Sequence, residues 1–383
     1  MNGMLATLRW MVVVVLVVHG LLHLPGVAAG FGWAEIEQLG QPIGPAGAVL
    51  WLLAALLVLA TAATLAVGAP TWWWVLAAVA AVVSQTAILT SWSDAGAGTA
   101  VTVLLVLMAG YGFLAEGPTS FHARWREHAT SAVRVQRTDP PVLTEADLDV
   151  LPGPLATYVR RTGAVGRPRV VSVHAELRGR IRSGPDSGWM SFTGEQLNTY
   201  GPRPQRAFLI DAIRGGLPVT VLHSYADTTA TMRGRLLSLV TVLDSAGPEM
   251  NRGETVTVFN DLVLLAPGAL VDAPVEWTEV DGDRVRGVFT TGDQRVSADL
   301  LFDDSGDLVD FHSPDRLRAS EDGSSFTRQP WSTPITERRD FHGVRLPAVG
   351  RARWLDPETG DWFTYIELEF TDVAHNVRAE DIG

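Results

Sequence analysis

Four long apolar stretches without a charged side chain dominate the first part of the chain. They cover residues 10–30, 46–67, 72–92 and 99–115. Each is about long enough, at 1.5 Å per residue, to cross a hydrocarbon core of roughly 30 Å. Trp33, Trp72 and Trp92 stand at their ends, where indole rings prefer the headgroup layer. The pattern predicts an α-helical four-helix transmembrane bundle over residues 1–116.

The first stretch has a second interpretation. Arg9 precedes the apolar run, and Val27-Ala28-Ala29 resembles the cleavage site of a signal peptide. His19 and His23 interrupt the run, which favours a helix that stays in the protein. Both interpretations leave the C-terminal part on the same side of the membrane.

A different pattern begins after the last apolar stretch. Residues 117–167 are expected to form a juxtamembrane linker and helix, in which residues 121–139 are a polar helix touching anionic lipid or a solvated linker. Thr144 with Asp147 has the spacing of a capping box and predicts a short helix.

From residue 168 the apolar positions recur every second residue, as in half-buried strands. In residues 171–182 the apolar side chains fall on one face and the polar ones on the other. Further strands are expected at residues 190–198, 206–214, 218–225, 229–233, 236–243, 285–290, 295–302, 308–313, 335–341, 344–354 and 362–370, with one clear helix near 253–265. The prediction for residues 168–383 is a mainly antiparallel β (α+β) curved half-barrel.

Composition removes several classes of function. All 30 basic residues are arginine and cysteine is absent, which excludes a P-loop, Schiff-base chemistry, disulfides and thiolate sites. The net charge is −12, so a nucleic-acid partner is not expected. The motifs of metalloproteases, of α/β-hydrolases and of dinucleotide binding are also missing. We therefore predict no catalytic residue, no cofactor and no metal, and expect a binding protein rather than an enzyme.

Arginines near the helix ends predict the orientation. Arg9 precedes the first helix and Arg124 and Arg126 follow the fourth, whereas the outer connectors carry only acidic residues. This places a multi-pass protein in the cell membrane, with both termini and the soluble domain in the cytoplasm.

Polar side chains inside the bundle are candidate functional groups, because an ionisable residue at membrane depth must be paired or wetted. They are His19, His23, Gln85 and Asp94. The two histidines are spaced i, i+4 and project from one helix face. Three roles remain open: packing through hydrogen bonds to Gln85 or a backbone carbonyl, a proton or ligand path, and a metal or haem site.

In the soluble part, aromatic and arginine residues are the candidate ligand-binding groups. Trp331 lies in a stiff stretch between two prolines and is expected to line or gate a barrel mouth, although aromatic rings also fill cores. Arginines are suited to a phosphate or carboxylate headgroup. The candidates are Trp331, Thr333, Trp354, Trp362, Tyr365, Arg206, Arg214 and Arg233.

Several strings resemble a family of uncharacterised bacterial multi-pass membrane proteins that contains a domain of unknown function. They are His19-Gly20-Leu21-Leu22-His23, Ser91-Trp92-Ser93-Asp94, Pro330-Trp331-Ser332-Thr333-Pro334 and Phe341-His342-Gly343-Val344-Arg345-Leu346-Pro347. The hairpin at residues 303–310 and the strand entry at 343–347 also resemble the lipoprotein-carrier (LolA/LolB-like) half-barrel. That resemblance implies a fold that shields acyl chains.

Three functions from different classes remain. The first is a membrane-anchored module whose half-barrel binds or shields a lipid or other hydrophobic ligand. The second is a structural or regulatory subunit docking on another membrane or envelope protein, which predicts an exposed apolar patch. The third is an enzyme on a lipid-like substrate, which requires a cluster of His, Asp or Glu within a cavity.

Overall fold

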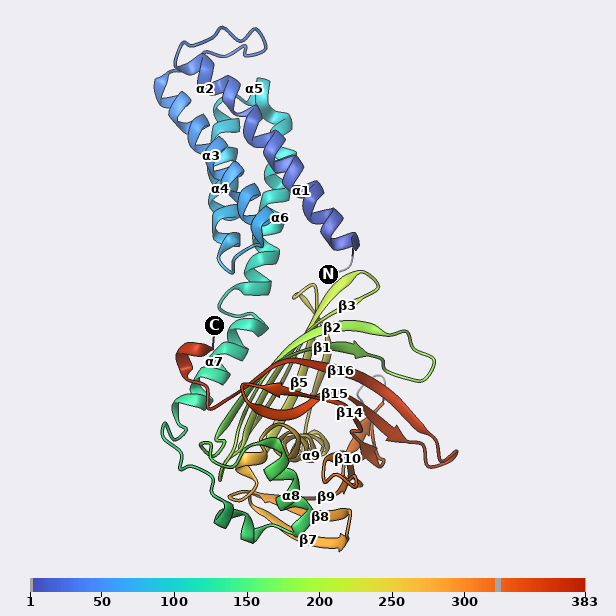
Figure 1. Ribbon diagram of the computed structural model, residues 1–383. Helices are drawn as coiled ribbons and strands as arrows, with labels where there is room; N and C mark the ends of the chain where they lie inside the picture. The colour runs from blue at the N-terminus through green and yellow to red at the C-terminus, as the bar shows by residue number, and fades with distance from the viewer. Residues whose placement is uncertain (1–2, 321–324, 383) are drawn as a thin grey trace. The chain divides into compact units, whose positions relative to one another are not determined.

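The computed structural model describes residues 3–320 and 325–382 (Figure 1). The chain divides into two compact units, Met1–Ala123 and Arg124–Gly383. Each unit has a hydrophobic core of its own, and the two are described separately below.

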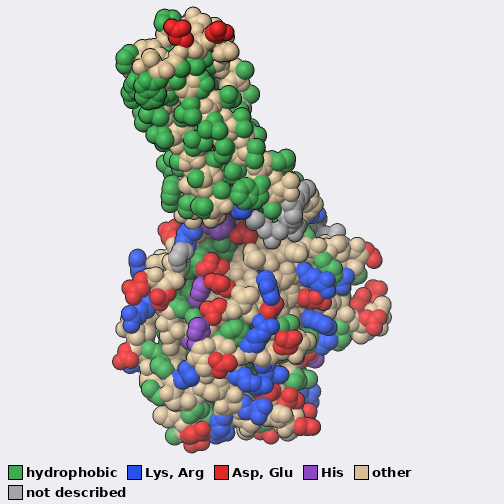
Figure 2. Space-filling view, turned by 45° about the horizontal axis from the view of Figure 1, so that its top comes forward, with side chains coloured by type: hydrophobic (Ala, Val, Ile, Leu, Met, Phe, Trp, Pro, Cys, Tyr) green, Lys and Arg blue, Asp and Glu red, His purple; other side chains and the backbone are tan. Residues whose placement is uncertain are grey.

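The first unit is an antiparallel helical bundle whose surface is covered by hydrophobic side chains (Figure 2). Four helical stretches are long and apolar enough to cross a membrane: Ala6–Gly30, Pro45–Val67, Trp73–Thr90 and Trp92–Arg134. The helices are α1 (Gly3–Leu22), α2 (Leu24–Gly30), α3 (Pro45–Val67), α4 (Trp73–Thr90), α5 (Trp92–Ala95) and α6 (Thr99–Glu116), with the 3₁₀ turn η1 (Gly96–Gly98). The predicted four apolar helices are confirmed, and the first is broken at His23, where α2 begins with Pro25 in its first turn.

Small residues bring the helices of this bundle close together. Ala54 on α3 and Ala77 and Ala80 on α4 are buried, whereas large apolar residues such as Leu56 and Val82 are exposed. This inversion of a soluble protein's pattern suits lipid, where close backbone approach rather than the hydrophobic effect holds helices together.

The second unit is built on one strongly curved sheet. Thirteen strands follow the order β6-β5-β4-β3-β2-β1-β16-β15-β13-β10-β9-β8-β7, all neighbours pair antiparallel, and β14 pairs with β15. The strands are β1 (Ser172–Ile181), β2 (Met190–Thr199), β3 (Gln205–Arg214), β4 (Leu217–Ala226), β5 (Thr229–Leu236), β6 (Val240–Ala246), β7 (Val275–Asp281), β8 (Arg284–Thr291), β9 (Gln294–Phe302), β10 (Leu308–Ser313), β13 (Trp331–Ser332), β14 (Ile335–Phe341), β15 (Val344–Leu355) and β16 (Trp362–His375). A separate hairpin joins β11 (Leu317–Ala319) to β12 (Phe326–Arg328). The predicted α+β half-barrel is confirmed.

Helices cover both faces of this sheet. The long helix α9 (Pro248–Leu265) lies inside the curve (Figure 1). The C-terminal part of α7 (Phe121–Arg134) packs on the opposite face, where the Trp125 indole N–H donates to the carbonyl oxygen of Ala207 at 3.2 Å. The remaining helices are α8 (Gly153–Thr162), η2 (Glu145–Val150), η3 (Pro267–Ala269) and η4 (Ala379–Asp381). η2 begins with the predicted capping box of Thr144 and Asp147.

Some element boundaries differ from the sequence prediction. The run 236–243 is not one strand, because Leu237 and Ser238 have positive φ and turn the chain between β5 and β6. The helix expected near 253–265 begins earlier, at Pro248, whose fixed φ suits a first helical turn. β7 was not predicted, and neither were β11, β12 and β13. The last three have only two or three residues, which is too few to show an alternating pattern.

Candidate functional site

The inner helix α9 carries polar side chains into the interior of the half-barrel. Every residue from Gly253 to Leu265 is buried. Glu254, Thr257 and Asp261 recur at i, i+3 and i+7, so they share one face of the helix. Phe259, on another face, packs against Phe289, with ring centroids 5.3 Å apart, and anchors α9 in the core. A buried polar face requires polar partners or a ligand.

A cavity of about 380 Å³ lies between this helix face and the central strands of the sheet. The volume falls in the range of small-molecule sites. The apolar side chains on the sheet side of the cavity come from β1, β3, β5, β15 and β16. They include Leu177, Ile181, Phe208, Ile210, Met232, Ala348, Ala352, Ile366, Leu368 and Phe370. The cavity therefore has a hydrocarbon wall on these strands and a polar wall where α9 faces β2 and β3.

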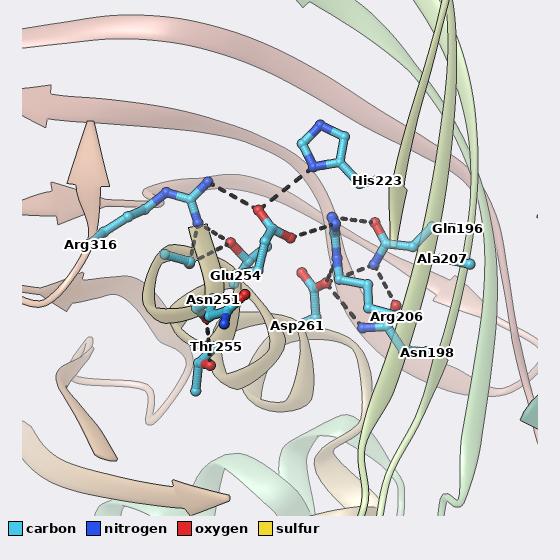
Figure 3. A network of polar contacts seen from close by, with 12 residues as sticks. Gln196, Asn198, Arg206, Ala207, His223, Asn251, Glu254, Thr255, Asp261 and Arg316 are labelled. Atoms are coloured by element: carbon cyan, nitrogen blue, oxygen red, sulfur yellow. Dashed lines mark hydrogen bonds and ion pairs between the residues drawn. The ribbon is translucent and has the colours of Figure 1, made fainter. Parts of the chain in front are cut away.

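The polar wall is organised around Arg206, which β3 points toward α9 (Figure 3). Its Nη1 lies 3.1 Å from Glu254 Oε2 and its Nε lies 2.8 Å from Asp261 Oδ2. Gln196 and Asn198 of β2 also donate to Asp261 Oδ2, at 2.8 and 3.0 Å. The side chains of Arg206, Glu254 and Asp261 are 6%, 4% and 11% exposed. Arg206 of β3 and the two carboxylates of α9 thus form a buried ion-pair network, to which β2 adds amide donors.

Electrostatics hold Glu254 in its ionised form. Burial alone would raise the pKa of this carboxyl, but the nearby Arg206, His223 and Arg316 outweigh it and keep the pKa well below its ordinary value. Asp307, which lies outside the cavity, behaves in the same way: hydrogen bonds from Arg161 outweigh burial and lower its pKa. Glu254 is thus a charged structural group at neutral pH and is not poised as a general base.

Arg316 joins the polar network to the aromatic wall. Its guanidinium lies 4.6 Å from the Trp331 ring and 5.8 Å from that of Trp354. It donates to the carbonyl oxygen of Gly253 at 2.9 Å and to the hydroxyl of Thr257, and it lies 3.8 Å from Glu254. Figure 3 shows the contacts of this guanidinium with α9, and the two rings lie close to the same group.

The structure brings five of the eight soluble candidates to this cavity. Trp331 Nε1 donates to the Tyr365 hydroxyl at 3.1 Å, and the Trp354 and Tyr365 rings stack at 5.7 Å. Thr333 accepts a hydrogen bond from the Asn260 side chain at 2.7 Å. Arg206 also lines the cavity, but its charge is already matched by Glu254 and Asp261.

The other three candidates lie away from the cavity lining. The Trp362 ring is 4.4 Å from the Arg353 guanidinium and 5.5 Å from His312. Arg233 pairs with Asp244 at 3.2 Å, and Arg214 is exposed at the end of β3. Of the three arginines named from the sequence as candidate headgroup ligands, only Arg206 therefore lines the cavity.

Sequence reasoning missed the residues at the centre of the network. Glu254, Asp261, Gln196 and Arg316 were not singled out. One signal was available, since Glu254, Thr257 and Asp261 form a polar stripe at helical spacing beside the apolar residues Val256, Phe259 and Val263. Gln196 and Arg316 gave no such signal, because they meet the stripe only through the curvature of the sheet.

In the helical unit, Ser84 links the two buried histidines. The Nε2 atoms of His19 and His23 each lie 3.1 Å from Ser84 Oγ. The expected partner Gln85 instead donates to the Thr99 hydroxyl at 3.2 Å. Asp94, at the end of the bundle, accepts a hydrogen bond from the backbone N–H of Gln41 at 3.2 Å. Over residues 3–320 and 325–382, no group of three His, Asp or Glu side chains is arranged to hold a metal ion.

Comparison with known proteins identifies the family. Residues 141–368 match the model of the family of unknown function DUF6544. The chain belongs to this family. The match covers most of the half-barrel, including α9 and the cavity lining, and confirms the resemblance to a domain of unknown function. No curated protein matches the chain.

Solved structures similar to this DUF6544 chain include three bacterial proteins. A DUF1329 family protein from Desulfovibrio piger matches with a TM-score of 0.32 and 12% identity, over 62% of this chain and 95% of that one. A LolA superfamily protein from Nitrosomonas europaea matches with a TM-score of 0.32 and 11% identity, over 63% and 97%. A putative outer membrane lipoprotein-sorting protein domain from Vibrio parahaemolyticus matches with a TM-score of 0.30 and 10% identity, over 56% and 89%.

Proposed function

We propose that this protein is a membrane-anchored binding module whose half-barrel takes a hydrophobic ligand into the cavity between α9 and the sheet. The observation that carries the proposal is the apolar wall of that cavity, formed by side chains such as Phe208, Ile366 and Leu368. Each methylene group that a ligand buries there contributes about 0.8 kcal/mol. A chain of several methylenes is enough to offset the cost of association.

The aromatic side chains support the same proposal. Trp331, Trp354 and Tyr365 hold one another by a hydrogen bond and a ring stack. They therefore form a rigid surface that is pre-organised before a ligand arrives, which lowers the entropy lost on binding. The four apolar helices of the first unit would tether this module to the membrane from which a lipid ligand comes.

The network on α9 favours binding over catalysis. The cavity lining contains the carboxylates of Glu249, Glu254 and Asp261. Those of Glu254 and Asp261 are engaged by arginine or amide donors, so neither of these two is free to accept a proton from a substrate. Such a network instead offers hydrogen-bonding positions along one side of a ligand whose other side is hydrocarbon.

The test is native mass spectrometry with lipid extraction on the full chain, purified in nanodiscs and released in the spectrometer. We expect a stoichiometric apolar adduct. In the variant Ile366→Trp, the indole fills space beside Ala352 and should reduce the adduct at least about tenfold, since overpacking a cavity removes room for the ligand.

Thr371→Trp is the matched control, because Thr371 is an exposed residue of the same strand. It should keep the adduct at the wild-type level. A wild-type chain without any adduct, or equal occupancy in both variants, would contradict the proposal and direct attention to a protein partner.

A further inference from the structure

Arginine side chains lie at the end of the cavity that the β11–β12 hairpin covers. Arg316 and Arg318 are two residues apart at β11, so they share one face of the strand, and both line the cavity. Arg182, which directly follows β1, lines it as well. Three cations from two distant segments of the sequence therefore line the same cavity.

Two of these cations rest on the same aromatic ring. The guanidinium carbon of Arg182 lies 4.7 Å from the centroid of Phe363, and that of Arg318 lies 5.4 Å from it. Arg182 donates to the carbonyl oxygens of Thr364 and Pro185, at 2.9 and 3.0 Å. Stacking and carbonyl bonds thus hold the guanidinium groups in place without neutralising their charge.

Among the residues that the structure describes, this pair of arginines has no carboxylate partner. Within the described ranges 3–320 and 325–382, neither Arg182 nor Arg318 has an acidic side chain within 4.0 Å. This contrasts with arginines elsewhere in the unit, where Arg161 and Arg345 share Asp307 at 2.8 and 2.7 Å. Uncompensated like charges held together are relieved by an anion.

The residues that line the cavity carry more positive than negative charge. The carboxylates of Glu254 and Asp261 are already engaged by Arg206, and Arg316 shares Glu254. A third carboxylate, that of Glu249, also lines the cavity, but among the described residues it forms no ion pair with Arg182 or Arg318. These two arginines therefore remain as surplus cations beside the hydrocarbon wall of the cavity.

We propose that the ligand is an amphiphile with an anionic headgroup, a carboxylate or a phosphate, held by Arg182 and Arg318 while its tail lies along the apolar wall. This inference rests on the proposed function and names the ligand's chemical class. Guanidinium groups stacked on a ring keep their N–H donors at the edge, which is the geometry that a carboxylate or phosphate accepts.

The experiment compares two probes with the same tail on the full chain in phosphatidylcholine nanodiscs. One is a fatty acid with a dansyl group at the end of its chain, and the other is its uncharged methyl ester. Empty nanodiscs measure partition into the bilayer. We expect the chain to bind the acid at least about tenfold more tightly than the ester, a difference of about 1.4 kcal/mol.

The double variant Arg182→Gln and Arg318→Gln should lose this preference and leave the affinity for the ester unchanged. Arg214→Gln is the matched control, because Arg214 is an exposed arginine outside the cavity lining, and it should keep the preference. An unchanged melting temperature would show that the double variant is folded. Equal binding of the two probes by the wild type, or a preference that survives in the double variant, would overturn the inference while leaving the proposed function in place. Binding of neither probe would overturn both.

Competition identifies the source of the anion. Displacement of the acid probe by palmitate supports a carboxylate headgroup, and displacement by lysophosphatidylglycerol supports a phosphate. Lysophosphatidylcholine, which has the same kind of tail but a zwitterionic headgroup, should compete at least about tenfold less well. Equal competition by the zwitterion would overturn the anionic specificity.

Discussion

At the scale of the residue, buried charged side chains form one wall of the cavity inside the half-barrel. Arg206 and Glu254 are almost fully buried, and burying a matched ion pair is often no better for stability than apolar packing. Breaking such a pair is costly, because one charge is left without its partner. Replacing any one charged residue of this network is therefore expected to lower the stability of the half-barrel.

Glu254→Gln should lower the free energy of unfolding by about 3 kcal/mol, because Arg206 and Arg316 would lose a shared anion. Chemical denaturation of the full chain, followed by tryptophan fluorescence, measures this. Glu276→Gln, at the exposed pair with Arg295, should change it by less than about 0.5 kcal/mol. A Glu254→Gln chain as stable as the wild type at pH 7 would contradict the role of the network.

The pH dependence of stability tests the role of Glu254 in a second way. The pKa of Glu254 is lower in the folded chain than in the unfolded one, so its stabilisation is complete above the ordinary carboxyl pKa of 4.5. It is lost as the pH falls below that value toward the folded pKa. The wild type should thus lose more stability between pH 6 and pH 3 than Glu254→Gln does.

At the scale of the element, polar side chains connect helices that are otherwise apolar. Ser84 of α4 contacts His19 of α1 and His23 at the break before α2. A serine hydroxyl has one proton and two acceptor lone pairs, so it can donate to at most one imidazole and must accept from the other. At least one of the two histidines therefore carries a proton on Nε2.

Ser84→Ala should destabilise the full chain in detergent by about 1 kcal/mol, since polar contacts between membrane helices contribute about that much. The melting temperature from intrinsic fluorescence measures the effect. Thr86→Ala is the control on the same helix, because the Thr86 hydroxyl is exposed and bonds only within α4, to the carbonyl oxygen of Val82. An equal effect of the two substitutions would show that Ser84 does not link the helices.

At the scale of the whole molecule, orientation in the membrane decides which compartment the binding module samples. Arg9 before the first helix and the arginines after the fourth favour a cytoplasmic location for both, whereas Glu35, Glu37 and Asp94 occupy the connectors at the other end. A cytoplasmic half-barrel would collect its ligand from the inner leaflet or from the cytosol.

The absence of cysteine makes this orientation directly measurable. In intact cells, a membrane-impermeant maleimide should label the single-cysteine variant Glu35→Cys. It should label Arg137→Cys only after the cells are opened. Labelling in the reverse order would place the half-barrel outside the cytoplasm and would contradict the prediction from the arginines.

The sequence by itself determined the elements whose patterns are long and local. The four apolar helices follow from long uncharged stretches, the capping box at Thr144 follows from the spacing of two residues, and most of the long strands follow from alternation along the strand. Boundaries failed where one residue carries the information, as at Leu237, whose positive φ ends β5 inside an apolar run. Strands as short as β13 were missed for the same reason.

Only the tertiary structure decided which of these elements surround the cavity. Arg206 was predicted as a headgroup ligand from its residue type, yet the fold places it beside Glu254 and Asp261, about fifty residues away along the chain. Arg182 and Arg318 meet at Phe363 in the same way. Contacts of this kind depend on how strongly the sheet curves around α9. That curvature results from the packing of many side chains together, and no local stretch of sequence encodes it.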